Sequence, residues 1–307
     1  MVMTASTIPV ELLRLHFGDA VQENVSLAPY TSARIGGLAD VLVTVKSADG
    51  LADVMKIIWA HEIPYYILGG GSNVLVSDKG VRGVVVLNRA KEVRFESGDQ
   101  PTVWCEAGGI FSNLANRCAS KAMAGLEWAA TVPGTIGGAV YGNAGAFGGD
   151  ISGNLIWAEL LTKNGHEKFS VDQMGYGYRT SILKRGDINT IVLSALLRLK
   201  NSNKEEVSVK IEEFSERRKT TQPPGASMGS MFKNPVGDHA GRLIEAAGLK
   251  GTRIGNAEIS KLHGNFFINH GETRAEDIHA LIRLVQKIVS EKFGVQLELE
   301  VELVGDW

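Results

Sequence analysis

The sequence is poor in cysteine, in excess charge and in long apolar runs, and each shortage excludes a class of protein. Its two cysteines, Cys105 and Cys118, are too few for a disulfide framework, and neither has a partner at metal-ligand spacing. Lys and Arg number 32 against 34 Asp and Glu, so the chain lacks the basic field that attracts nucleic acid or an anionic membrane. No apolar run approaches the roughly 20 residues that span a bilayer, and the first ten residues do not resemble a signal peptide. We therefore expect a cytoplasmic protein without nucleic-acid or membrane partners.

Glycine is the one residue type in clear excess. Thirty-six of the 307 residues are glycine, against a usual share of about 7%. They gather in two segments, 69–73 and 131–149, which marks these segments as unusual turns or ligand sites. The seven histidines, by contrast, are scattered and form no pair at the spacing of a metal motif. We therefore expect no metal site.

Short apolar runs alternate with helical patterns and predict an α+β fold rather than a regular βαβ array. The length suggests two domains at about 150 residues each. Strands are expected at 41–45, 65–68, 74–76, 84–87, 103–106, 156–162, 190–199 and 295–304. Helices are expected from the cap Ser47 or Asp49 to 60, from Ser112 towards 125, and at 205–218, 240–247 and 277–293. The polar run 200–204 is interpreted as a linker.

The first glycine segment, Gly69-Gly70-Gly71-Ser72-Asn73, lies between two expected strands. Its main-chain N–H groups can approach a diphosphate without a Cβ in the way. It is not a P-loop, because no Gly-Lys-Ser/Thr follows, and a strand rather than a helix follows it, which excludes the dinucleotide fingerprint. Taken alone, it is equally consistent with a tight turn.

The second glycine segment reads TVPGTIGGAVYGNAGAFGG over 131–149, and no period of either kind persists along it. So long a glycine-rich loop is uncommon unless a ligand or a close main-chain contact requires it. Close packing of two segments is the plain alternative. Two such segments in one domain together favour a single extended cofactor with a diphosphate, held largely by main-chain donors.

Three other segments carry polar side chains that chemistry could use. Arg179 lies beside tyrosines, where a surface stack or a salt bridge is the commoner role. Ser230 lacks the G-x-S-x-G context of a hydrolase nucleophile. The last expected strand has alternating acidic residues, for which a solvated face is the plain interpretation: Glu298, Glu300 and Glu302.

With these motifs in this order, the sequence resembles the UDP-N-acetylenolpyruvoylglucosamine reductase family, also called UDP-N-acetylmuramate dehydrogenase, in its shorter second type. The resemblance covers about 28–305. Its most specific segments are ILGGGSNVLVSDKGVRG (67–83), TVPGTIGGAVYGNAGAFGGDI (131–151), YRTSIL (178–183), GSMFKNPVGDHAGRLIEAAGLKG (229–251) and GVQLELEVELVG (294–305). The chain departs from the family at Gly142, often Met, at Leu299, often Pro, and in the loop 224–228.

The resemblance implies a two-part FAD-binding domain of the vanillyl-alcohol-oxidase (PCMH) type over 1–200 and a smaller α+β domain for the UDP-sugar over 201–297. A C-terminal strand over 298–307 would carry a catalytic glutamate. The implied activity is NADPH-dependent reduction of the enolpyruvyl group of UDP-N-acetylglucosamine-enolpyruvate through FAD. The product, UDP-N-acetylmuramate, serves peptidoglycan synthesis and so the cell wall, cell shape and cell division. NADPH and the UDP-sugar are the expected partners, and a monomer is the simplest assembly.

The resemblance assigns three catalytic roles. Arg179 would stabilise the enolate-like charge, since a guanidinium is permanently charged and fits a carboxylate with two hydrogen bonds. Ser230 would give the proton to the α-carbon. Glu300 would assist as an acid or polarising group, with Glu298 as the rival if the register slips.

The resemblance also assigns binding roles. The expected FAD contacts are Gly69, Gly70, Gly71, Ser72, Asn73, Thr131, Pro133, Gly134, Thr135, Gly137, Gly138, Asn143, Ala144 and Gly145. The expected UDP-sugar contacts are Tyr178, Lys233 and Asn234, with His263 and Asn265 as weaker candidates.

Two alternative functions remain at this point. An FAD-dependent oxidase of the same fold would keep both glycine segments, but it would not need Arg179, Ser230 and Glu300 together. A flavin- or nucleotide-sugar-binding protein without turnover is disfavoured, because all three positions hold chemically competent residues.

Overall fold

The computed structural model describes residues 8–307, which fall into two compact units. The first unit takes the described residues up to Gln22, then Val41–Gly70 and Gly83–Glu216. The second takes the remaining segments: Glu23–Asp40, Gly71–Arg82 and Arg217–Trp307. The second unit therefore includes a short excursion, Gly71–Arg82, that leaves the first unit directly after Gly70 and returns to it at Gly83.

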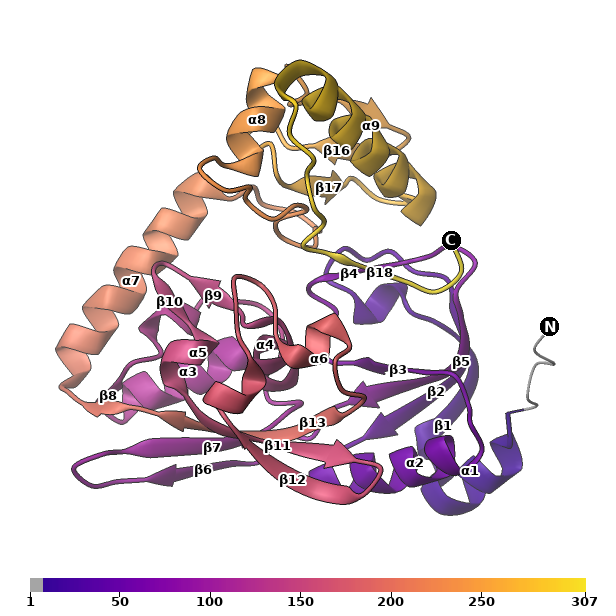
Figure 1. Ribbon diagram of the computed structural model, residues 1–307, viewed down its shortest axis with the longest axis vertical. Helices are drawn as coiled ribbons and strands as arrows, with labels where there is room; N and C mark the ends of the chain where they lie inside the picture. The colour runs from indigo at the N-terminus through magenta and orange to yellow at the C-terminus, as the bar shows by residue number, and fades with distance from the viewer. Residues whose placement is uncertain (1–7) are drawn as a thin grey trace. The chain divides into compact units, whose positions relative to one another are not determined.

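Two β-sheets make up most of the first unit, and one of them also takes in residues 23–26, 38–40 and 81–82 of the second (Figure 1). One has the order β1-β2-β5-β3, made by Val21–Ser26, Leu38–Val45, Val81–Asn88 and Tyr65–Leu68. The other has the order β12-β11-β13-β7-β6, made by Gly165–Ser170, Leu155–Thr162, Ile191–Arg198, Thr102–Glu106 and Val93–Glu96. β3 and β5 run parallel, whereas the neighbours in the second sheet are antiparallel.

Two apolar cores lie against these sheets, and the first also takes in Leu161, Ile191 and Leu193 of the five-stranded sheet. Helix α2 (Ala48–Ala60) begins where the Ser47 hydroxyl accepts a 3.0 Å hydrogen bond from the Gly50 N–H, which decides between the two expected caps. Its apolar face joins the four-stranded sheet in one core, through Leu51, Ala52, Val54, Met55 and Ile58. The second core lies between the five-stranded sheet and the helices α3 (Phe111–Ser120) and α4 (Ile136–Gly142).

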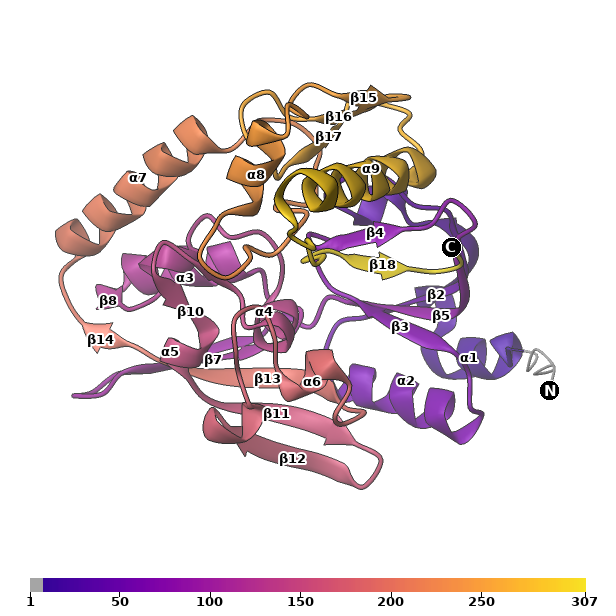
Figure 2. The ribbon, with the colours of Figure 1, turned by 45° about the horizontal axis from the view of Figure 1, so that its top comes forward.

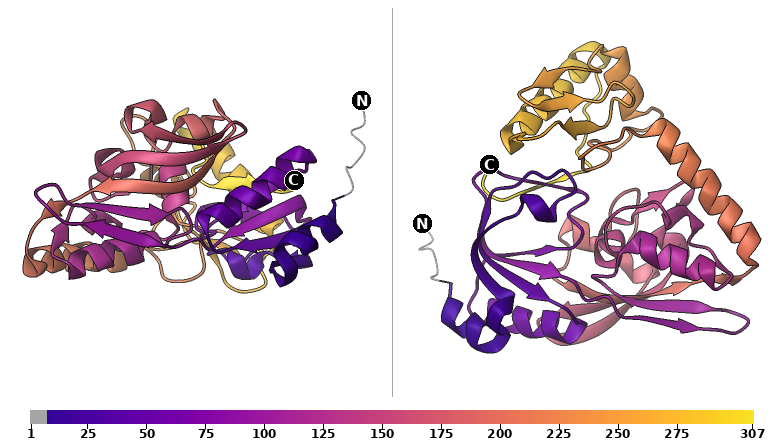
Figure 3. Two further views of the ribbon diagram at one scale, coloured as in Figure 1. Left: turned by 90° about the horizontal axis from the view of Figure 1, so that it is seen from below. Right: turned by 180° about the vertical axis from the view of Figure 1, so that it is seen from behind.

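Short elements and most of a longer helix complete the first unit. The short ones are α1 (Val10–Phe17), β8 (Met123–Ala124), β9 (Gly145–Ala146), β10 (Gly149–Asp150), α5 (Ile151–Asn154), α6 (Ile182–Arg185) and β14 (Lys200–Asn201). Helix α7 (Lys204–Thr221) is long and straight (Figure 3). Val207 on α7 is buried, and Ile211 and Phe214 pack against the second core, as the sequence predicts.

The second unit combines a small sheet, two helices and a parallel strand pair. Its sheet has the order β15-β16-β17, made by Arg253–Ile254, Ala257–Ile259 and Phe267–Asn269. Helices α8 (Ala240–Ala246) and α9 (Ala275–Phe293) bury their apolar faces in one core with this sheet. In the parallel pair, β4 (Val74–Val76) of the excursion lies beside β18 (Glu302–Val304) at the end of the chain (Figure 2).

The prediction of an α+β fold is confirmed, and most expected elements form within one to four residues of their expected ends. No helix within residues 8–307 is long and apolar enough to cross a bilayer. The glycine terminators are also correct: Gly248 donates to the Glu245 carbonyl after α8, and Gly294 adopts a φ of 69° after α9.

Three expectations about helix ends and loops are wrong. Helix α3 begins one residue before Ser112 and has no side-chain cap. The segment 131–149 is not irregular throughout, because α4 forms within it despite its glycines. The run 200–204 is not a simple linker, since β14 pairs with β8 in an antiparallel bridge.

Two expectations near the C-terminus are corrected as well. Asp277 is not the cap of α9 but its third residue, where its carboxylate accepts from the Arg274 N–H. The tail 295–304 is not one strand. It forms an isolated bridge between Leu299 and Phe232 and joins β4 only from Glu302 onward, because its main-chain partner changes along its length. The alternation in its sequence reflects burial, since Leu297 and Val301 are both 3% exposed.

Candidate active site

Residues of the two glycine segments meet in the first unit, in the close packing given above as the plain alternative to a ligand site. A Cβ added to Gly70 would lie 2.8 Å from the Cα of Gly134, and a Cβ on Gly69 would overlap the Thr135 hydroxyl. Real Cβ atoms essentially never come so close. The main chains at these positions therefore pack with no room for side chains, which is the arrangement that a main-chain cradle needs.

Two polar side chains adjoin this cradle. The Arg89 guanidinium donates a 2.8 Å hydrogen bond from Nη1 to the Gly69 carbonyl, which fixes the first glycine turn. Within residues 8–307, the Thr131 Oγ1 atom is buried and has no hydrogen-bond partner. A buried hydroxyl without a partner is costly unless a ligand satisfies it. The cradle and this hydroxyl together fit a bound dinucleotide.

Not every glycine-segment residue offers its N–H group to a ligand. The Gly137 N–H donates to the Ala107 carbonyl at 2.8 Å, and the Ala144 N–H donates to the Ala139 carbonyl at 2.9 Å. Gly71 has a φ of 59°, and a Cβ there would overlap the Tyr30 carbonyl. These three residues shape the fold. Five other predicted FAD contacts belong to the two glycine segments. Pro133, Gly138 and Gly145 lie in the first unit, Gly145 within β9, and Ser72 and Asn73 lie in the second.

The side chain of Asn143 is hydrogen-bonded within the protein. It ends α4 with a φ of 46°. Its Oδ1 accepts from the Ser152 N–H and its Nδ2 donates to the Gly177 carbonyl, both at 3.0 Å. Asn143 thus fixes the turn that follows Gly177 rather than presenting its amide to a ligand.

That turn carries Arg179 in a strained conformation. Gly177 and Thr180 exchange two main-chain hydrogen bonds of 3.2 and 3.3 Å around it. Arg179 has a φ of 56°, a region that residues with a Cβ rarely adopt and that often marks functional sites. Its Nη2 donates a 2.6 Å hydrogen bond to the Gly145 carbonyl. A Cβ on Gly145 would lie 3.2 Å from Nη1, so this glycine lets the guanidinium approach.

Tyr178 precedes Arg179 in the same turn. The residue is 55% exposed, and the guanidinium carbon of Arg179 lies 5.6 Å from its ring centroid. A cation at this distance from an aromatic face is attracted to it. Tyr178 is therefore an exposed ring beside a fixed cation, as a substrate-contacting residue would be.

Ser230 belongs to the second unit, in a short extended segment held by Asn265. The buried amide of Asn265 accepts from the Phe232 N–H at 2.9 Å and donates to the Phe232 carbonyl at 2.8 Å. The Asn265 carbonyl also accepts from the Met231 N–H at 2.8 Å. Ser230 itself forms an isolated bridge with Phe266. Asn265 thus acts as a strand partner, a role that its position in the sequence does not reveal.

Glu300 lies beside this segment in the same unit. Its N–H donates to the Met231 carbonyl at 2.9 Å, and its own carbonyl accepts from the Asn73 amide at 2.9 Å. The structure therefore joins the segments that carry Ser230 and Glu300, which are 70 residues apart in the sequence. Arg179 belongs to the first unit.

The other predicted substrate contacts all have structural partners. The Lys233 ammonium lies 3.2 Å from the Glu298 carboxylate, and the Lys233 N–H donates to the Glu298 carbonyl. The Asn234 side chain accepts from the Ala240 N–H at the start of α8. The His263 Nδ1 accepts from the Asn265 N–H, and burial, followed by the charge of Lys250, lowers its pKa from the usual value.

Other reactive side chains are not activated. Burial raises the pKa of the Cys105 and Cys118 thiols to about 12, so neither is a thiolate nucleophile near neutral pH. Burial also raises the pKa of Tyr176, whose hydroxyl donates to the Val140 carbonyl at 2.9 Å. Over residues 8–307, no three His, Cys, Asp or Glu side chains are grouped to hold a metal ion.

Two family models match separate parts of the chain. Residues 39–168 match the model of an FAD binding domain, and residues 220–304 match the model of the UDP-N-acetylenolpyruvoylglucosamine reductase C-terminal domain. The prediction that FAD is the cofactor is therefore confirmed at the level of the domain.

Whole-chain similarity extends further. UDP-N-acetylenolpyruvoylglucosamine reductase of Chloroflexus aggregans is 43% identical over 92% of this chain and 97% of the relative. That of Bacillus subtilis is 42% identical over 93% and 94%. The crystal structure of UDP-N-acetylenolpyruvylglucosamine reductase (MurB) from Thermus caldophilus is 37% identical, covers 91% of this chain and 97% of that chain, and aligns with a TM-score of 0.78. On these grounds, the chain belongs to the UDP-N-acetylenolpyruvoylglucosamine reductase family.

Proposed function

We propose that this chain reduces the enolpyruvyl group of UDP-N-acetylglucosamine-enolpyruvate to give UDP-N-acetylmuramate, with NADPH as the reductant and FAD as the cofactor. The single observation that carries the proposal is the hydrogen bond from the Glu300 N–H to the Met231 carbonyl. It joins the two remote segments of the chain that carry the proposed hydroxyl, Ser230, and the proposed carboxyl, Glu300. The family membership supplies the substrate and the reductant.

FAD, when held by these residues, would supply hydride transfer from NADPH to the β-carbon of the enolpyruvyl group. Addition at that carbon develops negative charge on the α-carbon and the carboxylate. Arg179 stabilises this charge, because its guanidinium is permanently charged and planar. The turn between Gly177 and Thr180 and the hydrogen bond to Gly145 hold the guanidinium in place before substrate arrives.

Ser230 donates a proton to the α-carbon, and Glu300 assists it. A serine hydroxyl is a weak acid, so it gives up a proton only to a strongly basic carbon or with help from a neighbour. Glu300 is the neighbour whose main chain is tied to the residue after Ser230. Glu298 is less suited to this role, because its carboxylate is 75% exposed and is paired with Lys233.

We also propose which residues hold the ligands. FAD is held by main-chain groups of Gly69, Gly70, Ser72, Pro133, Gly134, Thr135 and Gly138, with the Thr131 hydroxyl. The loops around it are shaped by Gly71, Gly137, Asn143, Ala144 and Gly145. Tyr178 contacts the UDP-sugar directly. Lys233, Asn234 and His263 act within the proposed UDP-sugar domain, 201–297, where their structural partners fix their positions. A monomer acting in the cytoplasm is the assembly and location we propose.

Anaerobic flavin absorbance tests the activity. NADPH should bleach the visible flavin bands of the purified holoenzyme, and the enolpyruvyl UDP-sugar should restore them with formation of UDP-N-acetylmuramate. An oxidase of the same fold would give a different result: oxygen alone would restore the absorbance quickly and the UDP-sugar would not. A protein that is purified without flavin and does not take up added FAD would contradict the proposal.

A further inference from the structure

We propose that Asn73 is a positioning residue that holds Glu300 for the proton-transfer step, an inference that rests on the proposed function. Asn73 ends the first glycine segment, where its neighbours suggest a contact with FAD. Its side chain, however, is directed to the last segment of the chain. The Nδ2 of Asn73 donates a 2.9 Å hydrogen bond to the Glu300 carbonyl across 227 residues of sequence.

The main chain of Asn73 serves the same segment. Its carbonyl accepts a 3.0 Å hydrogen bond from the Glu302 N–H. From the next residue onward, β4 and β18 run in parallel register, with Val74 opposite Glu302 and Val76 opposite Val304. Asn73 therefore contacts the segment at Glu300 by its side chain and at Glu302 by its main chain, directly before the strand pairing begins.

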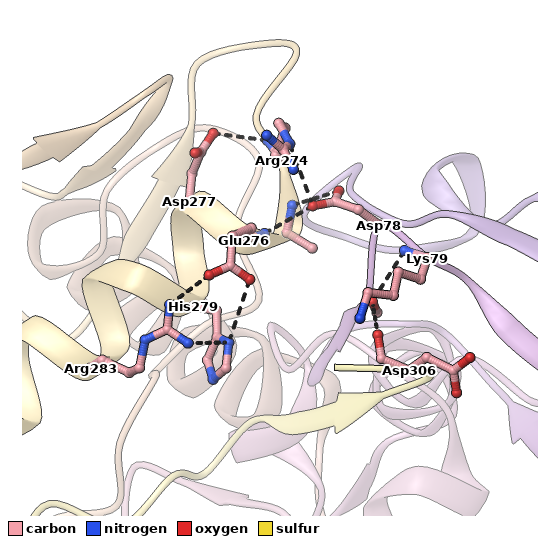
Figure 4. Close-up of polar contacts among 10 residues, drawn as sticks. Asp78, Lys79, Arg274, Glu276, Asp277, His279, Arg283 and Asp306 are labelled. Atoms are coloured by element: carbon pink, nitrogen blue, oxygen red, sulfur yellow. Dashed lines mark hydrogen bonds and ion pairs between the residues drawn. The ribbon is translucent and has the colours of Figure 1, made fainter.

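The rest of the excursion Gly71–Arg82 is anchored within the second unit. The Asp78 carboxylate accepts from the first two N–H groups of α9, those of Ala275 and Glu276, at 2.8 and 3.0 Å (Figure 4). Figure 4 also shows Asp306 beside this excursion, where the Ser77 hydroxyl donates to its carbonyl. Because the excursion is fixed at Asp78, Asn73 is a rigid support rather than a mobile loop residue.

These contacts restrain both main-chain polar groups of Glu300, its N–H and its carbonyl. Its N–H is bonded to Met231, next to Ser230, and its carbonyl is bonded to Asn73. Without the Asn73 amide, the Glu300 carbonyl loses this hydrogen bond, and the longer 3.5 Å hydrogen bond from the Val301 N–H to the Met231 carbonyl holds the same peptide group less firmly. The carboxyl would then move relative to Ser230. A displacement of about 1 Å can lower a rate by about 100-fold, so this restraint matters for the step in which Glu300 acts.

The test uses the FAD-loaded Asn73→Ala protein in stopped-flow absorbance, with the two half-reactions measured separately. We expect unchanged FAD affinity, an unchanged rate of flavin reduction by NADPH, and a decrease of about 10- to 100-fold in reoxidation by the enolpyruvyl UDP-sugar. Asn73→Asp, which keeps the size of the side chain but loses the amide donor, should show the same pattern if Asn73→Ala does not fold.

Asn269→Ala is the matched control. The Asn269 Nδ2 donates a 2.8 Å hydrogen bond to the Ala33 carbonyl in the same unit, so its loss is a comparable structural defect away from Glu300. It should leave both half-reactions unchanged. A decrease in reoxidation as large as that of Asn73→Ala would identify a general loss of structure and overturn the proposal.

A double-mutant cycle distinguishes positioning from other roles. In a Glu300→Gln background, Asn73→Ala should slow reoxidation by much less than in the parent, because the group it positions is already gone. A penalty of equal size in both backgrounds would overturn the inference. So would weaker FAD binding with both half-reactions slowed, since the amide would then serve the cofactor.

The failure of the inference can be told apart from that of the proposed function. If the parent turns over the enolpyruvyl UDP-sugar and Glu300→Gln slows reoxidation, a normal Asn73→Ala protein contradicts the positioning role alone. If Glu300→Gln reoxidises at the parent rate, the role of Glu300 and the positioning role of Asn73 are both wrong. If the parent does not accept the UDP-sugar, the proposed function itself is wrong, and the positioning role falls with it.

Discussion

The N–H of Glu300 donates a 2.9 Å hydrogen bond to the carbonyl of Met231, the residue that follows Ser230. One hydrogen bond thus joins the segment with the proposed proton donor to the segment with its proposed helper. The same short stretch is also bonded to Asn265 on its other side. The main chain of the segment that carries Ser230 is therefore held by both Glu300 and Asn265. This suits a hydroxyl that must deliver a proton to one carbon atom of the substrate.

Replacement of this serine gives the first prediction. Ser230→Ala should leave flavin reduction by NADPH nearly unchanged and slow reoxidation by the enolpyruvyl UDP-sugar by about 10²- to 10⁴-fold, the usual contribution of a general acid. Stopped-flow absorbance of each half-reaction measures both. Ser227→Ala, in the loop just before, should behave as the parent. A loss under about tenfold in Ser230→Ala would argue against Ser230 as the donor.

The contact between the two glycine segments gives the second prediction. Gly70→Ala places a methyl group where the Gly134 Cα leaves only 2.8 Å, so the two main chains must separate. Overpacking of this kind costs about 1–3 kcal/mol, and we expect FAD to bind about tenfold more weakly or worse. Titration of the apoprotein with FAD, followed by flavin fluorescence, measures the affinity.

Gly142 provides the matched control for that experiment. It lies in α4, and a Cβ there would have no atom within 4 Å. Gly142→Ala should keep the parent's FAD affinity and stabilise the protein by about 0.5–1 kcal/mol, because alanine favours the helix. Equal losses of FAD affinity in Gly70→Ala and Gly142→Ala would show that the close contact between Gly70 and Gly134 does not determine FAD binding.

The backbone at Arg179 gives the third prediction. With a φ of 56°, this residue has the conformation that glycine adopts without strain. Arg179→Gly and Arg179→Ala both remove the guanidinium, so both should fail equally in flavin reoxidation by the UDP-sugar. Arg179→Gly should nevertheless be the more stable of the two by about 1 kcal/mol in chemical denaturation, because alanine keeps the left-handed strain. Equal stabilities would mean that the turn relaxes freely.

Periodicity in the sequence was enough to predict most helices and strands, because burial on one face leaves a local pattern. Leu51, Val54 and Ile58 on α2 are an example. The start of a helix is harder to predict where the group that caps it comes from a distant part of the sequence. The first N–H groups of α9 are bonded to Asp78, about 200 residues earlier, so the nearby Asp277 was the natural but wrong choice.

The candidate site divides in the same way. An excess of glycine is visible in the sequence and needs a reason, so close packing of the two segments, as seen at Gly70 and Gly134, is one of the two expected outcomes. The hydrogen-bond partners of individual side chains are not visible in the sequence. Asn73 and Asn143 stand in glycine segments typical of cofactor loops, yet their amides bond to Glu300 and Gly177. Only the three-dimensional path of the chain determines which carbonyl such an amide meets.

His263 gives a prediction about pH. Burial, and next the charge of Lys250, lowers the pKa of this histidine from its usual value near 6.5. The folded protein therefore takes up this proton less readily than the unfolded chain, in which the histidine is solvated. Below about pH 6.5 the unfolded state binds more protons at this site, so the contribution of His263 lowers the free energy of unfolding as the pH falls through that range.

Two variants test this origin of the pH dependence. The His263→Gln protein should lose less stability than the parent between about pH 7.5 and 5.5, even if it is less stable at every pH because the ring packs against Gly241. The Lys250→Gln protein should lie between the two, since it removes only the second cause. Urea denaturation at several pH values measures all three proteins. If His263→Gln and the parent lose the same stability over this range, the pKa of His263 is not lowered in the folded protein. The pH dependence must then come from other groups.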